Sequence, residues 1–236
     1  VNGDKVIING KKSFVLNGKE ADIIIVPVRT SGSQTEAEGI SLFVVESDTS
    51  GILKNNYKTV DGHSASEITF KNVEVSKDNL LGEIGKGYQA LESTVDDAIL
   101  AVCAEATGIM KSLHDKTVEY SKNRVQFGVP IGGFQALQHR MVDTLMACEE
   151  TESILLWALT TSQDDSTSLK KAISGLKYQI GTAGKHVGQE AVQLHGGMGI
   201  SWELDIAHFF KRLSSIEILF GNADFHMKRF LMLSNN

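Results

Sequence analysis

The segment GEIGKGYQ, residues 82–89, separates two parts of the sequence that have different hydrophobic patterns. Before it, short runs of β-branched and aromatic residues alternate with turn residues, which is typical of strands. After it, apolar residues recur with the spacing of one helix face, at Leu91, Val95, Ala98, Val102, Ala106, Ile109 and Leu113. The change of period predicts an α+β protein, with an antiparallel β-domain at residues 1–82 followed by an up-and-down four-helix bundle at residues 83–236.

The individual elements are expected from the same patterns. Asn-Gly pairs at residues 9–10 and 17–18 predict hairpin turns with positive φ at Gly10 and Gly18. The polar segment SQDDSTS, residues 162–168, contains N-cap residues and predicts a connection between helices. Strands are expected in KVIING (5–10), KSFVLNG (12–18), ADIIIVPVRT (21–30), ISLFVVES (40–47) and ASEITFKNVEV (65–75), and the later helices at residues 134–161, 169–194 and 205–219.

Composition limits the class of protein. Of the 236 residues 42% are hydrophobic, and the formal net charge of −6 argues against a nucleic-acid partner. No apolar run reaches about 18 residues, so no membrane insertion is expected. Cys103 and Cys148 fall in predicted helices and are expected to be buried reduced thiols of a cytoplasmic protein. His186 and His195 lack partners at metal-ligand spacing, so no metal site is predicted. The missing initiator Met suggests a fragment.

The first candidate site is EYSKNRVQFGVPIGGFQ, residues 119–135, in which Arg124 ends a helix and Phe127 begins an irregular loop. A guanidinium beside an exposed aromatic ring can bind a pyrophosphate and pack on an adenine or its ribose. The alternative is structural. In that interpretation, Arg124 covers the helix C-terminus and Phe127 packs under the loop.

The second candidate site is EAVQLHGGMGIS, residues 190–201, where Gly196 and Gly197 follow Gln193 near the end of a helix. The glycines would let a ligand approach the backbone amides, and Gln193 offers hydrogen-bond donors and an acceptor to a heterocycle or phosphate. Here too a structural alternative remains, because glycines commonly form a helix C-cap and turn.

The third candidate is SSIEILFGNADFH, residues 214–226, in which Phe220 directly precedes Gly221. The order of the three motifs, on a β-domain followed by a helical bundle, resembles the acyl-CoA dehydrogenase family. The resemblance extends over essentially the whole chain and is carried by NGKKSFVLNGKEADIIIV, FKNVEVSKDNLLGEIGKGYQ, YSKNRVQFGVPIGGFQ, AVQLHGGMGIS and FGN. Such proteins carry an N-terminal helical domain before the β-domain, and this sequence lacks it.

The resemblance implies a flavoprotein that binds FAD between a β-domain and helical domains and removes two hydrogens from an acyl-CoA thioester. It also implies a homo- or hetero-oligomer, a dimer or tetramer, in which FAD contacts often cross a subunit interface. Phe14 stands where the family often has an aromatic residue beside the isoalloxazine, and Asn222 can hydrogen-bond the cofactor. The remaining residues implied to bind FAD are Arg124, Gln126 and Phe127 on the pyrophosphate and adenosine side, and Gln193, Gly196 and Gly197 in the second loop.

Two positions depart from the family pattern. Leu16 stands where a Thr or Ser usually hydrogen-bonds the flavin, and Phe220 stands where many members carry the Glu that abstracts the α-proton. Other members place that Glu on the first long helix, where the matching residue is Ala98. Asp96 and Asp97 precede Ala98, and Asp97 is expected to face another direction because successive helical residues point about 100° apart. Glu217 lies three residues, almost a full turn, before Phe220 and is expected to be a solvated or ion-paired helix residue. No catalytic residue is therefore assigned.

Two functions remain open at this point. The chain is expected to be an FAD-dependent acyl-CoA dehydrogenase-like subunit whose base is displaced or comes from a partner chain. The alternative is a non-catalytic binding or assembly subunit of a heteromeric flavoprotein.

Overall fold

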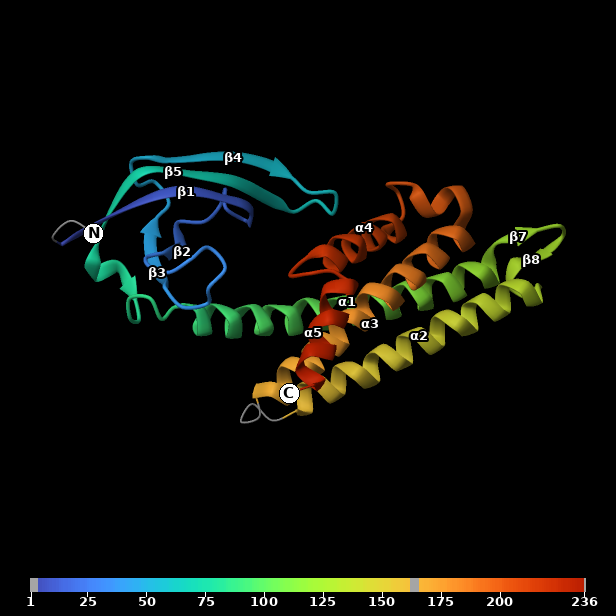
Figure 1. Cartoon of the computed structure of the whole chain (residues 1–236). Coiled ribbons are helices and arrows are strands. Elements are labelled where there is room, and N and C mark those ends of the chain that lie inside the picture. Colours follow the sequence, from blue (N-terminus) through green and yellow to red (C-terminus); the bar gives the residue numbers. More distant parts are fainter. Residues whose placement is uncertain (1–3, 162–165, 236) are drawn as a thin grey trace. The chain divides into compact units, whose positions relative to one another are not determined.

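The structure is a computed structural model that describes residues 4–161 and 166–235. It consists of two compact units, Val1–Thr94 and Val95–Asn236 (Figure 1). Most of the predicted polar connection, residues 162–165, lies outside the described residues. The next helix begins at Ser166, three residues before the expected start at Leu169.

The first unit is an antiparallel β-domain, as the sequence predicted. One three-stranded sheet has the order β1-β5-β4, and the other has the order β2-β3-β6. All pairings within the two sheets are antiparallel. The elements are β1 (Lys5–Leu16), β2 (Ile23–Arg29), β3 (Ile40–Glu46), β4 (Ile52–Lys58), β5 (Ser64–Ser76), the short 3₁₀ helix η1 (Lys77–Asn79) and β6 (Leu80–Leu81).

Side chains from both sheets form the core of this unit. The alternation of inward and outward residues along each strand places one apolar face of each sheet in a common cluster. The most deeply buried members come from β2, β3 and β5, and they are Val26, Phe43, Val45, Ile68, Phe70 and Val73.

The predicted hairpin at Asn9-Gly10 is wrong. β1 continues through this pair and stays paired with β5, with a shift of register between Ile8 and Gly10. The side chain of Asn9 explains the bulge, because its Oδ1 accepts a hydrogen bond of 2.8 Å from the backbone N–H of Asn72 on β5. Gly10 has positive φ, 143°, but within a bulge and not in a turn.

The second Asn-Gly pair does form a turn, but its geometry differs from the prediction. Asn17, and not Gly18, has left-handed φ, at 52°. The turn joins β1 to β2, which belong to different sheets, so it does not close a hairpin of paired strands. Asparagine adopts this conformation readily because its short side chain can hydrogen-bond locally.

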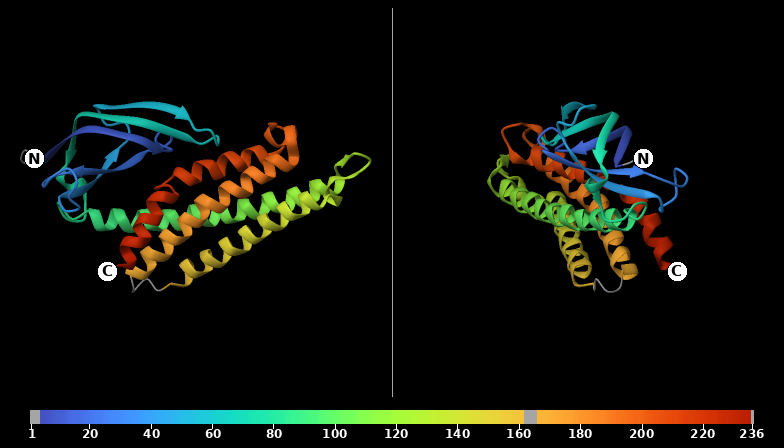
Figure 2. Two further views of the ribbon diagram at one scale, coloured as in Figure 1. Left: turned by 45° about the vertical axis from the view of Figure 1, so that its right-hand side comes forward. Right: turned by 90° about the vertical axis from the view of Figure 1, so that its left-hand side faces the viewer.

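The second unit is helical. The long helix α1 (Tyr88–Asn123) begins in the first unit, and its residues from Val95 onward belong to the second unit. α3 lies at the centre and packs against α2, α4 and α5 (Figure 2). The other elements are β7 (Val125–Gln126), β8 (Val129–Pro130), the 3₁₀ helix η2 (Ile131–Gly133), α2 (Gln135–Thr160), α3 (Ser166–His195), the 3₁₀ helix η3 (Gly196–Ile200), α4 (Asp205–Ile218) and α5 (Ala223–Ser234).

The fifth helix, α5, was not predicted. Gly221 ends the preceding pattern, and the sequence analysis placed no helix after it. The structure shows that Asn222 is an N-cap, with its Oδ1 accepting a 3.0 Å hydrogen bond from the N–H of Phe225. Arg229 of α5 forms a bidentate ion pair with Asp96 of α1, with nitrogen–oxygen distances of 2.7 and 2.9 Å. α5 is therefore anchored to the helical core by charge as well as by packing.

The two cysteines are free and buried, as the sequence predicted. Burial raises the pKa of Cys103 to about 12 and that of Cys148 to about 11. Both side chains therefore remain neutral thiols at physiological pH. None of the helices in the described ranges combines the length and the apolar character needed to cross a membrane.

We predict that Arg229→Met destabilises the helical unit by about 3–5 kcal/mol, because it leaves the buried carboxylate of Asp96 without its partner. Urea unfolding followed by far-UV circular dichroism measures the change. The double variant Asp96→Leu/Arg229→Met removes both charges and should recover part of the loss. Equal stability of Arg229→Met and the parent would show that this ion pair does not hold α5.

Candidate functional site

The first candidate motif forms a β-hairpin at the end of α1. Arg124 follows the last residue of the helix, and its backbone N–H donates to the carbonyl of Tyr120 at 2.8 Å. Phe127 stands at the turn between β7 and β8 with left-handed φ of 55° and is 92% exposed. Its ring meets the edge of Phe134 at a centroid distance of 6.1 Å. Phe127 therefore does not pack under the loop, and Arg124 and Gln126 are exposed beside it.

The second motif lies at the end of α3. Gln193 is exposed in the last turn of the helix, and Gly196 follows with φ of 59°. A Cβ atom added at Gly196 or Gly197 would meet no atom within 4 Å, so the space beside these two glycines is open. This openness is what close approach by a ligand requires, although Gly196 also has the conformation of a helix C-cap.

A ring stack brings the two motifs together. His195 is buried at the end of α3 and stacks on Tyr120 of α1, with ring centroids 4.2 Å apart. Its Nδ1 donates to the carbonyl of Ala191 at 2.8 Å, because a carbonyl can only accept. Burial lowers the pKa of His195, which keeps the ring neutral. As Figures 1 and 2 show, the β7–β8 hairpin and the turn after α3 lie at the same end of the helical unit.

An exposed guanidinium at this end of the unit can bind an anion. Arg140 of α2 and Glu190 of α3 form an ion pair of 2.5 Å, and this hydrogen bond raises the pKa of Arg140. Arg124 stands exposed on the hairpin next to the ring of Phe127. An exposed guanidinium and an exposed aromatic face, with open space beside the glycines, can together bind a phosphate and a flat heterocycle.

Phe14 belongs to the other unit, on β1. It lies in an irregularity of the β1–β5 pairing between Lys12 and Val15, has left-handed φ of 54° and is 42% exposed. Its N–H donates to the carboxylate of Glu67 at 3.2 Å. This bond lowers the pKa of Glu67 together with a hydrogen bond from Ser13, which is the larger cause. A bulge of this kind redirects a side chain away from the regular alternation of the strand.

Asn222 and Phe220 lie at the far end of α4 from the glycine turn. Because α4 is a 14-residue helix, the separation along its axis is about 20 Å. Phe220 has left-handed φ of 57°, is half-buried and packs against the helical core. The structure thus gathers Arg124, Gln126, Phe127, Gln193, Gly196 and Gly197 at one end of the helical unit and places Asn222 at the other end of α4.

The acids considered as displaced bases differ in their surroundings. Asp96 is buried and bound to Arg229, Asp97 is exposed, and Glu217 is half-buried near the end of α4. Ala98 is half-buried on α1. None of these observations assigns a base.

Two buried polar residues near Phe220, Lys177 and His226, are not among the residues expected from the sequence. Lys177 is fully buried, and its Nζ donates to the carbonyls of Glu217 and Gly221. The sequence does contain a pattern that predicts the burial of Lys177. It lies four residues after Ile173 and three before Ile180, on the apolar face of α3. A lysine at a core position of an apolar helix face indicates a buried partner.

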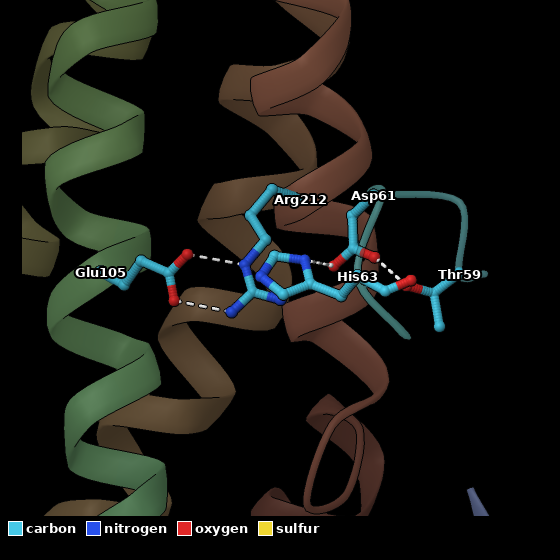
Figure 3. Close-up of polar contacts among 5 residues, drawn as sticks. All are labelled: Thr59, Asp61, His63, Glu105 and Arg212. Carbon is cyan, nitrogen blue, oxygen red and sulfur yellow. Dashed lines mark hydrogen bonds and ion pairs between the residues drawn. The ribbon is translucent and has the colours of Figure 1, made fainter. Parts of the chain in front are cut away.

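Two sets of polar contacts, one in each unit, are drawn in Figure 3. In the helical unit, Arg212 of α4 binds Glu105 of α1 through two bonds of 2.6 and 2.7 Å. In the β-domain, Asp61 accepts from the hydroxyl of Thr59, and its other oxygen lies 3.4 Å from Nδ1 of His63. Across the described ranges, no group of three or more His, Cys, Asp or Glu residues is placed to hold a metal ion.

Comparisons with known proteins match nearly the whole chain. Residues 1–73 match the family model "Acyl-CoA dehydrogenase, middle domain", and residues 85–232 match "Acyl-CoA dehydrogenase, C-terminal domain". A short-chain specific acyl-CoA dehydrogenase from Megasphaera elsdenii is 32% identical over 223 residues, covering 91% of this chain and 56% of the relative.

Two further proteins extend the comparison. Subunit CarC of the caffeyl-CoA reductase-Etf complex from Acetobacterium woodii is 29% identical, over 89% of this chain and 55% of the relative. The solved structure of PigA with FAD and proline superposes with a TM-score of 0.89 at 26% identity, over 97% of this chain and 60% of that one. The chain thus spans little more than half the length of the curated relatives it matches.

We predict that Phe127→Ser changes the free energy of unfolding by less than about 0.5 kcal/mol, because the ring is almost entirely exposed. Ile131→Ala, four residues later in a buried position, should cost about 2–5 kcal/mol. Chemical denaturation of both variants beside the parent measures the difference. A large loss in Phe127→Ser would mean that the ring supports the fold, which would remove the reason to assign it to a ligand or partner.

Proposed function

The chain belongs to the acyl-CoA dehydrogenase family, and on this premise we propose that it is part of an FAD-dependent flavoprotein acting on an acyl-CoA thioester. The observation that carries the proposal is the match of two successive domain models of that family, in order, along one chain. We assign the β-domain to residues 1–82 and the helical domain to residues 83–236. Two buried neutral thiols support a cytoplasmic location.

The residues at the shared end of α1 and α3 fit the FAD proposal. Arg124 offers a charged donor to the pyrophosphate, while Phe127 offers an exposed face to the adenosine. Gln193 and the amides of Gly196 and Gly197 offer further donors to the same cofactor. When bound, the flavin supplies the redox chemistry, and the protein binds and orients it.

The remaining two assignments concern positions away from this end. Phe14, redirected by its bulge, is assigned to the isoalloxazine side of the cofactor. The Oδ1 of Asn222 caps α5, so its contribution to the cofactor is assigned to the amide nitrogen. In this proposal Leu16 provides no hydroxyl to the flavin, because its side chain carries no donor.

We propose that this chain lacks a catalytic base of its own. A phenyl ring cannot accept a proton, and Phe220 packs against apolar side chains of the helical core. A base for removal of the α-proton then has to come from another carboxylate or from a partner chain. This need favours a homo- or hetero-oligomer, in which a second subunit completes the reaction of the first.

The outer face of α2 supports assembly into a dimer or tetramer. Large apolar side chains that are 40–56% exposed lie along this helix, at Val142, Leu145, Met146, Leu156, Trp157 and Leu159. Exposed apolar surface of this extent on one helix typically marks a protein interface. The name of the relative CarC describes a subunit of a complex with Etf, which agrees in kind with a heteromeric assembly.

A second candidate function is a non-catalytic binding or assembly subunit of a heteromeric flavoprotein. The observation that favours it is the absence of an ionisable side chain at both Phe220 and Ala98. Purification of the full-length protein distinguishes the two. A bound yellow chromophore supports the flavoprotein, whereas a colourless protein that still assembles supports the assembly subunit.

We predict that Arg124→Ala weakens FAD binding by about 1.5–3 kcal/mol, the contribution of a charge-assisted hydrogen bond. Titration of FAD against the folded full-length protein measures the change. Lys122→Ala, which removes an exposed cation two residues earlier, is the matched control and should bind FAD as the parent does. If Arg124→Ala lowers only thermal stability and leaves FAD affinity unchanged, the helix-capping interpretation of Arg124 is correct.

We predict that Phe220→Glu introduces modest acyl-CoA-dependent reduction of bound FAD in the full-length protein, because it places a carboxylate in surroundings apolar enough to raise its pKa. The rate should exceed that of Phe220→Gln, which has similar size but no base, by about 10²- to 10⁴-fold. Anaerobic bleaching of the flavin by a panel of acyl-CoAs measures it, beside thermal melts of each variant. Loss of several kcal/mol of stability without bleaching would show that residue 220 packs in the core and does not face the substrate. Rapid bleaching in the parent protein would refute the proposal that position 220 marks a missing base.

A further inference from the structure

Lys177 is a buried cation whose ammonium group binds the end of α4. Its side chain is fully buried on the core-facing side of α3. Nζ donates to the carbonyl of Glu217 at 2.8 Å and to that of Gly221 at 2.7 Å. These acceptors lie at the C-terminus of α4, where the helix dipole places partial negative charge. Burial lowers the pKa of Lys177, and the two short bonds to carbonyls compensate the ammonium group for lost hydration.

His226 binds the same turn from α5. Its ring is fully buried, and Nε2 donates to the carbonyl of Phe220 at 3.0 Å. Nδ1 has no hydrogen-bond partner within the described part of the chain. Burial lowers the pKa of His226 to about 4, so the neutral ring carries its proton on Nε2. Three carbonyls of one turn, those of Glu217, Phe220 and Gly221, are thus held by two buried side chains.

The turn between α4 and α5 has an unfavourable backbone. Phe220 and Gly221 follow one another with φ of 57° and 103°, and a phenylalanine rarely adopts such an angle. A Cβ atom at position 221 would lie 2.5 Å from Cδ1 of Phe225, so glycine fits this turn and larger residues do not. Residues in disfavoured conformations persist only where the surrounding contacts enforce them. The bonds from Lys177 and His226 are contacts of that kind.

We propose that Lys177 and His226 are positioning residues that hold Phe220 left-handed and thereby set the direction of the side chain at position 220. They are called the clamp below. The direction of a side chain follows from its backbone angles, so release of the carbonyls would let residue 220 return to negative φ and point elsewhere. The relevance of this position to an acyl-CoA site rests on the proposed function, whereas the clamp itself does not.

Hydrogen exchange of the backbone amides in residues 214–226 tests the clamp in the full-length protein. Lys177→Met keeps the length of the side chain and removes its donors. We expect exchange at Leu219, Gly221 and Phe225 to accelerate by about 10-fold or more, the effect of losing a charged hydrogen bond. Ile173→Ala, a buried change one turn away on α3, is the control and should accelerate exchange along α3 without this local effect. Equal exchange profiles in the two variants would overturn the proposal.

A second pair of variants decides the question where Lys177→Met does not fold. His226→Gln retains an N–H that can donate to the carbonyl of Phe220, whereas His226→Leu has none. We expect the first to exchange as the parent does and the second to expose residues 219–223. The same profile in both variants, whether slow or fast, would overturn the role of His226.

The effect of the clamp on flavin reduction is measured in the Phe220→Glu variant. With FAD at saturating concentration, adding Lys177→Met should slow flavin bleaching by about 10-fold, because the carboxylate at position 220 is displaced. An unchanged bleaching rate would overturn the positioning role. If Phe220→Glu alone shows no bleaching, the proposed function fails, and the exchange experiments still decide whether the clamp exists.

Discussion

The helical unit depends on the burial of one ammonium group. Lys177 lies among the apolar residues of α3, the helix that packs against α2, α4 and α5. An isolated charge in such a place costs several kcal/mol, and its hydrogen bonds to the carbonyls of Glu217 and Gly221 offset that cost. The carbonyls also need the ammonium group, because carbonyls at the end of a helix lack donors within that helix. These two hydrogen bonds therefore stabilise the turn from α4 into α5.

Three phenylalanines singled out in the sequence share an unusual backbone. Phe14, Phe127 and Phe220 all have φ between 54° and 57°, a region in which residues with a Cβ are rare. A different structural feature accounts for each angle. Phe14 lies in an irregularity of the β1–β5 pairing, Phe127 in a two-residue hairpin turn, and Phe220 in a turn whose carbonyls accept from buried donors. Strained residues concentrate at ligand and catalytic sites, where they direct side chains that regular elements could not. At all three positions the backbone points an aromatic side chain in a direction that a regular helix or strand would not give it.

Local patterns predicted the elements of this fold well, and side-chain contacts explain where they failed. Apolar periodicity located β1, β2, β3 and β5 and four of the five α-helices in the described residues, because burial of one face determines both. It missed β4, whose sequence ILKNNYK is largely polar. The hairpin at Gly10 failed since Asn9 hydrogen-bonds across to Asn72, a contact between residues distant in sequence. The pattern does not indicate α5, because Gly221 ends the preceding helix and the sequence alone does not show that Asn222 caps a new one.

The sequence predicted which motifs form the candidate site but not which of them lie close together in the fold. The sequence named Arg124 and Gly196 separately, and nothing in their spacing showed that Tyr120 and His195 stack and bring them together. Lys177 was missed for a related reason. Its position on an apolar face was readable, but its acceptors are backbone carbonyls, which carry no signal in the sequence.

The surroundings of the acids near Phe220 bear on the origin of a base. Asp96 is buried, but both its oxygens accept from Arg229, a cation that does not deprotonate, so the carboxylate is committed to the fold. Asp97, the next residue on α1, points about 100° away from Asp96 around the helix and is exposed. Glu217 lies one turn before Phe220, and its own carbonyl is part of the buried contact with Lys177. These surroundings support the proposal that the base is a carboxylate other than these three.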